Sequence, residues 1–342
     1  MARDLRLFFV FRLLATSYLW MPIFVLFQLE RGLAFDEIML LSVIYSGVFL
    51  IVEVPTGAFA DHIGRRQSMM LGALAMVGSC LVSYLAHDFG TFAVSQVLAG
   101  VSMALCSGAD SAYLFDLLHG NGRGDEYPVR EGHASAWHLF GNVGACLAGG
   151  LLASLDLGLP YLVNAGTAAL AFCVAMMMRD EQPLRVRTPQ PLGKELRQYL
   201  HLMRASVRDA ARNKRLAWII VYSAVVFALL RVTDYLYQPY LHTRGFDPME
   251  MGLVFAGISG FAAFMALRAD GLRRWLGEGA LIWGMLAILA VSFLVLHSLA
   301  APFALIVLAV QGAINGVYSP LVKPIINREI TDSGRRATVL SV

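Results

Sequence analysis

Between two long apolar runs, near residues 36–60 and 69–86, the chain reads Glu53-Val54-Pro55-Thr56-Gly57-Ala58-Phe59-Ala60-Asp61-His62-Ile63-Gly64-Arg65-Arg66. Gly57 has no Cβ and so permits the close approach of another helix. Asp61 ends the first run, where it can accept hydrogen bonds from the N-terminus of a neighbouring helix. Gly64 suits a tight turn, and Arg65 and Arg66 hold such a turn on the cytoplasmic side of a membrane. The segment is therefore predicted to connect two membrane-spanning helices.

The pattern G-x-x-x-D-x-x-G-R-R resembles the signature loop between helices 2 and 3 of the major facilitator superfamily, a family of secondary transporters. The resemblance implies that Gly57, Asp61, Gly64, Arg65 and Arg66 latch two helical halves together and release them during transport. The plainer alternative is an ordinary basic loop with helix caps. The pattern is specific for the family and silent on the substrate.

The composition indicates a polytopic membrane protein. Of 342 residues, 58% are hydrophobic and only 15% charged, with a mean hydropathy of +0.63, whereas soluble domains carry about 25% charge. The net charge of +3 is too small to indicate nucleic acid as a partner. There is no phosphate-binding G-x-x-x-x-G-K-[ST] loop and no nucleophile–base pair, so we expect neither an ATP-driven pump nor an enzyme. No cofactor or metal is expected, because all the cysteines fall inside apolar runs without ligand-like spacing: Cys80, Cys106, Cys146 and Cys173.

Ten apolar runs are long enough for helices that cross a hydrocarbon layer, which takes about 20 residues. They lie near 8–28, 36–60, 68–86, 89–118, 134–154, 158–178, 216–241, 249–267, 279–297 and 301–326. We place the N-terminus in the cytoplasm, because the outside loops then hold only Arg31 and Arg244 of the 27 lysines and arginines. The expected fold is all-α and multi-pass, in a cytoplasmic (inner) membrane.

The chain divides into an N-terminal six-helix bundle (1–178), a cytoplasmic linker (179–215) and a C-terminal bundle with helices 7–10 (216–342). In the linker, apolar residues share one face of a predicted helix and arginines another, which suits the inner membrane surface. The second half repeats the signature as Ala266-x3-Asp270-x2-Arg273-Arg274, without either glycine. Asp270 and Arg274 are therefore expected in a second copy of the loop. Two pseudo-repeated bundles are the architecture that the resemblance implies.

The second half is short by two membrane spans, and its end, 327–342, resembles the family's cytoplasmic loop that runs into helix 11. We therefore expect a chain truncated after helix 10. The alternative is a natural ten-helix transporter.

Charged residues at membrane depth are costly and usually functional. Arg231 and Asp234 lie three residues apart on one face of the predicted seventh helix and can pair. The resemblance implies that this helix faces a central substrate cavity. Two interpretations stay open: Asp234 carries a coupling proton and Arg231 contacts substrate, or the two form a structural pair or gate.

Two further acids lie within the first half. Glu53 precedes Pro55 near the end of helix 2, and it either braces against helix 4 or 11 or couples to protons. Asp110 lies in helix 4 and either pairs with Arg12 or Arg130 or carries a proton.

Four polar residues complete the candidate cavity. His138 can relay protons near neutral pH or simply find a hydrogen bond. Gln311 and Asn315 on helix 10 can contact substrate or another helix, and Tyr18 on helix 1 can line the cavity or pack.

Two departures count against a drug–proton antiporter. Gln96 stands where many such proteins carry an arginine, and the glycine-rich run 141–150 lacks their proline. We expect a secondary transporter that moves a small molecule by alternating access, with proton-coupled export preferred. The alternatives are import or uniport, and a non-transporting remnant or sensor. Its partners would be a small-molecule substrate, protons and the lipid bilayer, and a monomer is the default of the family.

Overall fold

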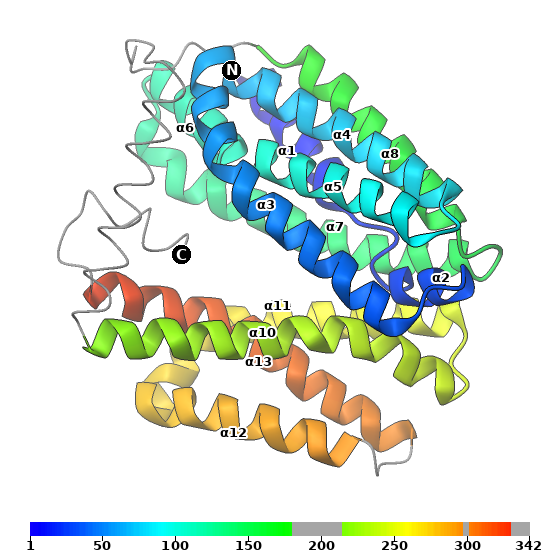
Figure 1. Ribbon diagram of the computed structural model, residues 1–342. Helices are drawn as coiled ribbons and strands as arrows, with labels where there is room; N and C mark the ends of the chain where they lie inside the picture. The colour runs from blue at the N-terminus through cyan, green and yellow to red at the C-terminus, as the bar shows by residue number, and fades with distance from the viewer. Residues whose placement is uncertain (180–213, 297–300, 330–342) are drawn as a thin grey trace. The chain divides into compact units, whose positions relative to one another are not determined.

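The computed structural model describes residues 1–179, 214–296 and 301–329 (Figure 1). The predicted amphipathic helix of the linker and most of the segment 327–342 lie outside these residues. Contacts divide the chain into two compact units, Met1–Leu196 with Asp247–Leu253 and Arg197–Phe246 with Val254–Val342. Each unit is described by itself below.

The helices of the first half are α1 (Ala2–Thr16), α2 (Phe24–Glu30), α3 (Phe35–Ile63), α4 (Arg65–Leu85), α5 (Phe89–Cys106), α6 (Ala109–Gly120), the short η1 (Gly124–Glu126), α7 (Tyr127–Ala153) and α8 (Leu159–Met177). Those of the second half are α10 (Lys214–Thr243), α11 (Pro248–Leu276), α12 (Glu278–Leu296) and α13 (Ala301–Glu329). Within the described chain, nine helical segments are long and apolar enough to cross a membrane. These segments confirm the predicted all-α, multi-pass fold.

The first predicted span, 8–28, is not one helix, because the chain leaves helical geometry between α1 and α2. Pro22 lies in this break, and proline cannot donate the backbone hydrogen bond that a continuous helix needs. The N–H of Leu19 instead donates to Oδ1 of Asn164 on α8, at 2.8 Å. Gly149 of α7 packs directly against the backbone carbonyl of Leu19. Neighbouring helices thus satisfy the backbone at this break, as a non-helical segment buried among membrane helices requires.

Two other boundaries differ from the prediction. The fourth predicted span breaks into α5 and α6 at Ser107 and Gly108, where Gly108 adopts φ 76°. The fifth begins at Tyr127 rather than near 134, because Pro128 fits the first turn of a helix. The extra turns bring polar residues of α7 into the first unit.

Small residues let α4 and α5 approach closely. The hydroxyl of Ser102 donates to the Gly72 carbonyl at 2.7 Å, and that of Ser68 donates to the Leu105 carbonyl at 2.6 Å. A Cβ added at Gly72 would come within 2.5 Å of the Cys106 sulfur. Hydrogen bonds between membrane helices contribute about 0.6 kcal/mol each, so packing and hydrogen bonding together hold this pair.

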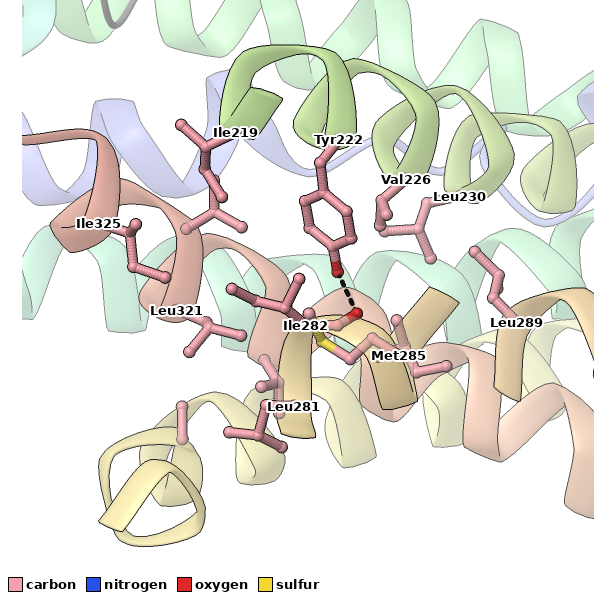
Figure 2. Packing of buried hydrophobic residues seen from close by; sticks show 14 of the residues in the cluster. Ile219, Tyr222, Val226, Leu230, Leu281, Ile282, Met285, Leu289, Leu321 and Ile325 are labelled. Atoms are coloured by element: carbon pink, nitrogen blue, oxygen red, sulfur yellow. Dashed lines mark hydrogen bonds between the residues drawn. The ribbon is translucent and has the colours of Figure 1, made fainter. Parts of the chain in front are cut away.

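In the second unit, α10, α12 and α13 enclose one apolar core (Figure 2). Tyr222 of α10 lies at its centre, and its hydroxyl donates to the Ile282 carbonyl of α12 at 2.8 Å. Satisfying this hydroxyl matters because an unpaired buried polar group costs about 1–3 kcal/mol. The core residues labelled in the figure are Ile219, Tyr222, Val226, Leu230, Leu281, Ile282, Met285, Leu289, Leu321 and Ile325.

Candidate functional site

The predicted signature loop forms a tight turn between α3 and α4. Gly64 adopts φ 103°, a conformation that a side chain would oppose. Arg65 forms an ion pair with Asp116 of α6, with Nε and Oδ2 3.6 Å apart. The guanidinium of Arg66 donates to the Met178 carbonyl just after α8, at 3.1 Å. Gly57 and Asp61 belong to α3, but the surroundings of Gly57 and the side chain of Asp61 lie outside what the structure describes.

A buried acid that the sequence analysis missed lies close to this loop. Asp4 of α1 accepts from the N-terminal ammonium group at 3.0 Å and from the Arg179 backbone N–H at 3.3 Å. The Tyr113 hydroxyl of α6 donates to the Arg179 carbonyl at 3.1 Å. Burial alone would raise the pKa of the Asp4 carboxyl, but its hydrogen bond and attraction to the ammonium group lower that pKa below the ordinary value. The ends of α1, α6 and α8 are therefore tied together.

The second copy of the signature differs from the first. Because it lacks a glycine in the place of Gly64, α11 continues through Arg273 and Arg274, and the turn comes at Gly277 with φ 82°. Asp270 pairs with Arg273 at 3.0 Å, and Arg273 also reaches Glu278 at 3.4 Å. Arg274, the arginine singled out from the sequence, is exposed.

An ion pair lies inside the first unit. Arg12 of α1 contacts Asp110 of α6, and their side chains are only 16% and 12% exposed. Arg12 is thus the partner of Asp110, whereas the alternative, Arg130, binds Glu126 at 3.0 Å. Oδ1 of Asp110 also accepts from the Ser111 N–H at 2.6 Å. The glycine at position 108 starts α6 so that this carboxylate lies in its first turn, where the helix dipole favours negative charge.

Glu53 lies on the other side of the α5–α6 break. Its Oε1 accepts from the Ser107 hydroxyl at 3.2 Å, so Glu53 contacts the fourth predicted helix, one of the two expected for bracing. Thr56 strengthens this contact, because its hydroxyl donates to the Ala104 carbonyl at 3.0 Å.

Glu131 of α7 joins the same polar region and was not foreseen. The Ser111 hydroxyl donates to its Oε1 at 3.0 Å, while its Oε2 is buried without a hydrogen-bond partner. Glu131 lies outside the predicted span 134–154 but inside α7, which begins at Tyr127. Extending the helical register backward from Ala134 would have found it.

His138 and Tyr18 also lie near the Arg12 guanidinium, within electrostatic range. Nδ1 of His138 is buried without a hydrogen-bond partner. The Tyr18 ring packs against Trp20, with centroids 5.3 Å apart. The structure thus gathers Tyr18, Asp110 and His138 around Arg12.

The second unit holds the predicted pair on α10. Arg231 and Asp234 are 3.4 Å apart, with side chains 45% and 24% exposed. Gln311 of α13 is instead buried in a hydrogen-bonded chain: its Oε1 accepts from the Tyr237 hydroxyl at 2.8 Å, and its amide donates to Ser292 at 2.7 Å. Gln311 therefore joins three helices, while Asn315 is exposed one turn further along α13.

Metal chemistry finds no support in the described chain. No three His, Cys, Asp or Glu side chains come together there in an arrangement that could hold an ion. None of the four cysteines forms a disulfide within the described residues.

Sequence comparison places this architecture among known proteins. The family model described as "Major Facilitator Superfamily" matches residues 7–342. A relative from Bacillus subtilis (strain 168), "Uncharacterized MFS-type transporter YxaM", is 22% identical over 253 residues, which are 72% of this chain and 60% of the relative. The chain thus matches less than two thirds of that relative's length.

Solved structures show the same fold at low sequence identity. The nucleoside transporter NupG superposes with a TM-score of 0.77 at 13% identity, covering 99% of this chain and 84% of NupG. A bacterial homolog of the human lysosomal transporter Spinster gives 0.73 at 18% identity, covering 99% and 78%. The D-xylose-proton symporter gives 0.65 at 15% identity, covering 99% and 84%. Because the family model matches residues 7–342, nearly the whole chain, the chain belongs to the major facilitator superfamily.

Proposed function

We propose that this chain is a secondary transporter that moves a small molecule across the cytoplasmic membrane by alternating access. Its N-terminus lies in the cytoplasm, and the protein acts as a monomer. The bundles 1–178 and 216–342, which the linker 179–215 joins, move against each other during transport. Membership of a transporter family supports this role over enzymatic activity.

One observation carries the proposal, namely the ion pair between Arg12 and Asp110 inside the first unit. Placing charged groups at membrane depth is costly, and such groups usually mark ion or substrate pathways. A purely structural pair could be replaced by apolar side chains at little cost to stability. The polar groups around this pair, on three different helices, favour a functional site.

We assign proton coupling to the acids at membrane depth, with Asp110, Glu53 and Asp234 as candidates. Arg231 and Asn315 are exposed on α10 and α13 of the second unit and are candidate substrate contacts, together with Tyr18 and His138 of the first. Gln311 fixes the packing of α10 and α13, the helices that carry Arg231 and Asn315. The signature residues Gly57, Asp61, Gly64, Arg65 and Arg66, with Asp270 and Arg274, form the gating latch.

Export is the preferred direction, and import is the alternative that the similar structures support, since one is titled a D-xylose-proton symporter. The deciding experiment reconstitutes the purified chain in liposomes with a pH-sensitive dye inside. Uridine and D-xylose serve as probes, because similar structures are titled as transporters of nucleosides and xylose.

If a probe and protons move in opposite directions, the protein is an antiporter suited to export. Movement in the same direction makes it a symporter. Asp88→Asn is a matched control, because Asp88 caps α5 between the spans, where it accepts from the Thr91 N–H at 3.0 Å. Export is refuted by co-directional movement, and the transporter proposal is refuted if a wide panel of metabolites shows no flux above that of empty liposomes.

A further inference from the structure

Two carboxylates share one hydroxyl-bearing residue in the first unit. The Ser111 backbone N–H donates to Asp110, and the Ser111 hydroxyl donates to Glu131. Within the described chain, Asp110 is the one of these two carboxylates that contacts a cation, namely Arg12. The side chains of Arg12, Asp110 and Glu131 therefore carry one positive and two negative charges. The negative charge that Arg12 does not neutralise is on Glu131.

The two acids differ in how their oxygens are satisfied. Asp110 accepts from a guanidinium and from a backbone N–H, so protonating it would break an ion pair. Glu131 accepts from one neutral hydroxyl, and its Oε2 is buried without a partner. A buried carboxylate oxygen without a hydrogen bond is costly, and a proton on that oxygen removes the surplus charge.

Among the residues that the structure describes, no cation forms an ion pair with Glu131. Arg12 of α1 contacts Asp110 of α6, the neighbour of the Ser111 whose hydroxyl binds Glu131. His138 of α7 lies within electrostatic range of Arg12. Glu126 of η1 is neutralised by Arg123 and Arg130. On α7 itself, Tyr127 lies within electrostatic range of both Glu131 and Arg12. The packed helix α8 has no charged residue from Leu159 to Met177.

We propose that Glu131 is the proton acceptor of the first unit and that Asp110 is a positioning residue that holds Arg12. One proton passes from a hydronium ion to Oε2 of Glu131, which leaves water and a neutral carboxylic acid, and the same atom later returns the proton to water. No other bond changes. This inference rests on the proposed proton coupling. In the first unit it replaces the candidates Asp110 and Glu53 by Glu131, a residue that the sequence did not indicate.

The test measures protonation directly and needs no substrate. Infrared difference spectra of the reconstituted protein, recorded between alkaline and acidic pH, reveal the carbonyl stretch of a protonated carboxyl group. The spectra are recorded in an Asp234→Asn background, so that Asp234 of the second unit contributes no carboxyl band. We expect Glu131→Gln to lose a band that Asp88→Asn retains.

A second variant shows whether a lost band reflects the missing carboxyl group or a misfolded protein. Glu131→Asp keeps the acid, and we expect the band to persist at a shifted frequency. A band that Glu131→Gln leaves unchanged, or that Asp88→Asn also removes, overturns the inference. Where Glu131→Gln does not fold, a band that does not shift in Glu131→Asp overturns it.

The liposome assay separates this inference from the proposed function. In Glu131→Gln we expect proton movement to fall by about tenfold or more, while exchange of the probe without a pH gradient continues. A band lost in Glu131→Gln with no flux of any metabolite would keep the protonation site and refute transport. Normal coupled flux in Glu131→Gln would keep transport and refute the role of Glu131.

Discussion

Replacing Gly149 by alanine should loosen the contact between α7 and the break in the first helix. The added Cβ would lie 2.9 Å from the Leu19 carbonyl carbon, and closer still to its oxygen, against an ordinary contact of at least 3.4 Å. The neighbour is backbone, so it cannot rotate away, and the two segments must separate by at least the difference of 0.5 Å. That separation also strains the hydrogen bond from Leu19 to Asn164.

Overpacking of this kind costs about 1–3 kcal/mol, and a weakened buried hydrogen bond adds about 1 kcal/mol. The total of about 2–4 kcal/mol corresponds to a fall in Tm of roughly 4–16 °C for a unit of this size. A thiol-reactive fluorogenic dye can report the melting, because Cys80 and Cys146 are buried until the protein unfolds.

Gly144→Ala is the matched control on the same helix. A Cβ there meets nothing within 4 Å, so we expect no loss, and a gain of up to about 1 kcal/mol from the better helix propensity of alanine. Equal melting temperatures for the two variants would refute the close approach at Leu19.

Ser102→Ala should lower the free energy of unfolding by about 0.5–1.5 kcal/mol, because the Gly72 carbonyl loses its donor; a melting curve identical to wild type would contradict this. Asp4→Asn should destabilise the protein at neutral pH. Because the folded pKa of Asp4 is lowered from 3.8, the ion pair stabilises above about pH 4 and its contribution disappears as pH falls through the lowered value, so the gap in Tm between wild type and variant should close in acid. Gln311→Leu should cost about 1–3 kcal/mol in a chemical denaturation series, since two buried partners lose their hydrogen bonds, whereas Asn315→Ala should stay within about 0.5 kcal/mol. Equal losses in these two variants would rule out the buried network.

The length of the apolar runs was enough to predict the helices, because membrane thickness leaves few other solutions for an apolar chain. The turn at Gly64 was also predictable, since the glycine and the two arginines are local signals. Local signals failed where distant residues decide the geometry. Pro22 marks a break in the first helix, but the hydrogen bond that satisfies the backbone there comes from Asn164, far along the chain.

The candidate site shows the same division. Arg12 was one of the two partners predicted for Asp110, because both residues are charges inside apolar runs. Arg130 was the other. Glu131 was missed because three polar residues precede Ala134, and the helix start was placed after them. The turn at Gly277 was missed because the repeat was matched by its arginines, whereas the helix ends where a glycine permits it.

The break in the first helix also sets an order of events during synthesis. The N–H of Leu19 is satisfied by a residue 145 positions later in the chain. At about 5–20 residues per second, a ribosome needs roughly 7–29 s to reach Asn164 after making Leu19. Throughout that interval the first helix lacks its final partner and depends on water, the insertion machinery or a temporary contact. The first span can therefore reach its final structure only after the sixth span, α8, has been synthesised. Premature release of the nascent chain before α8 should leave a fragment open to degradation.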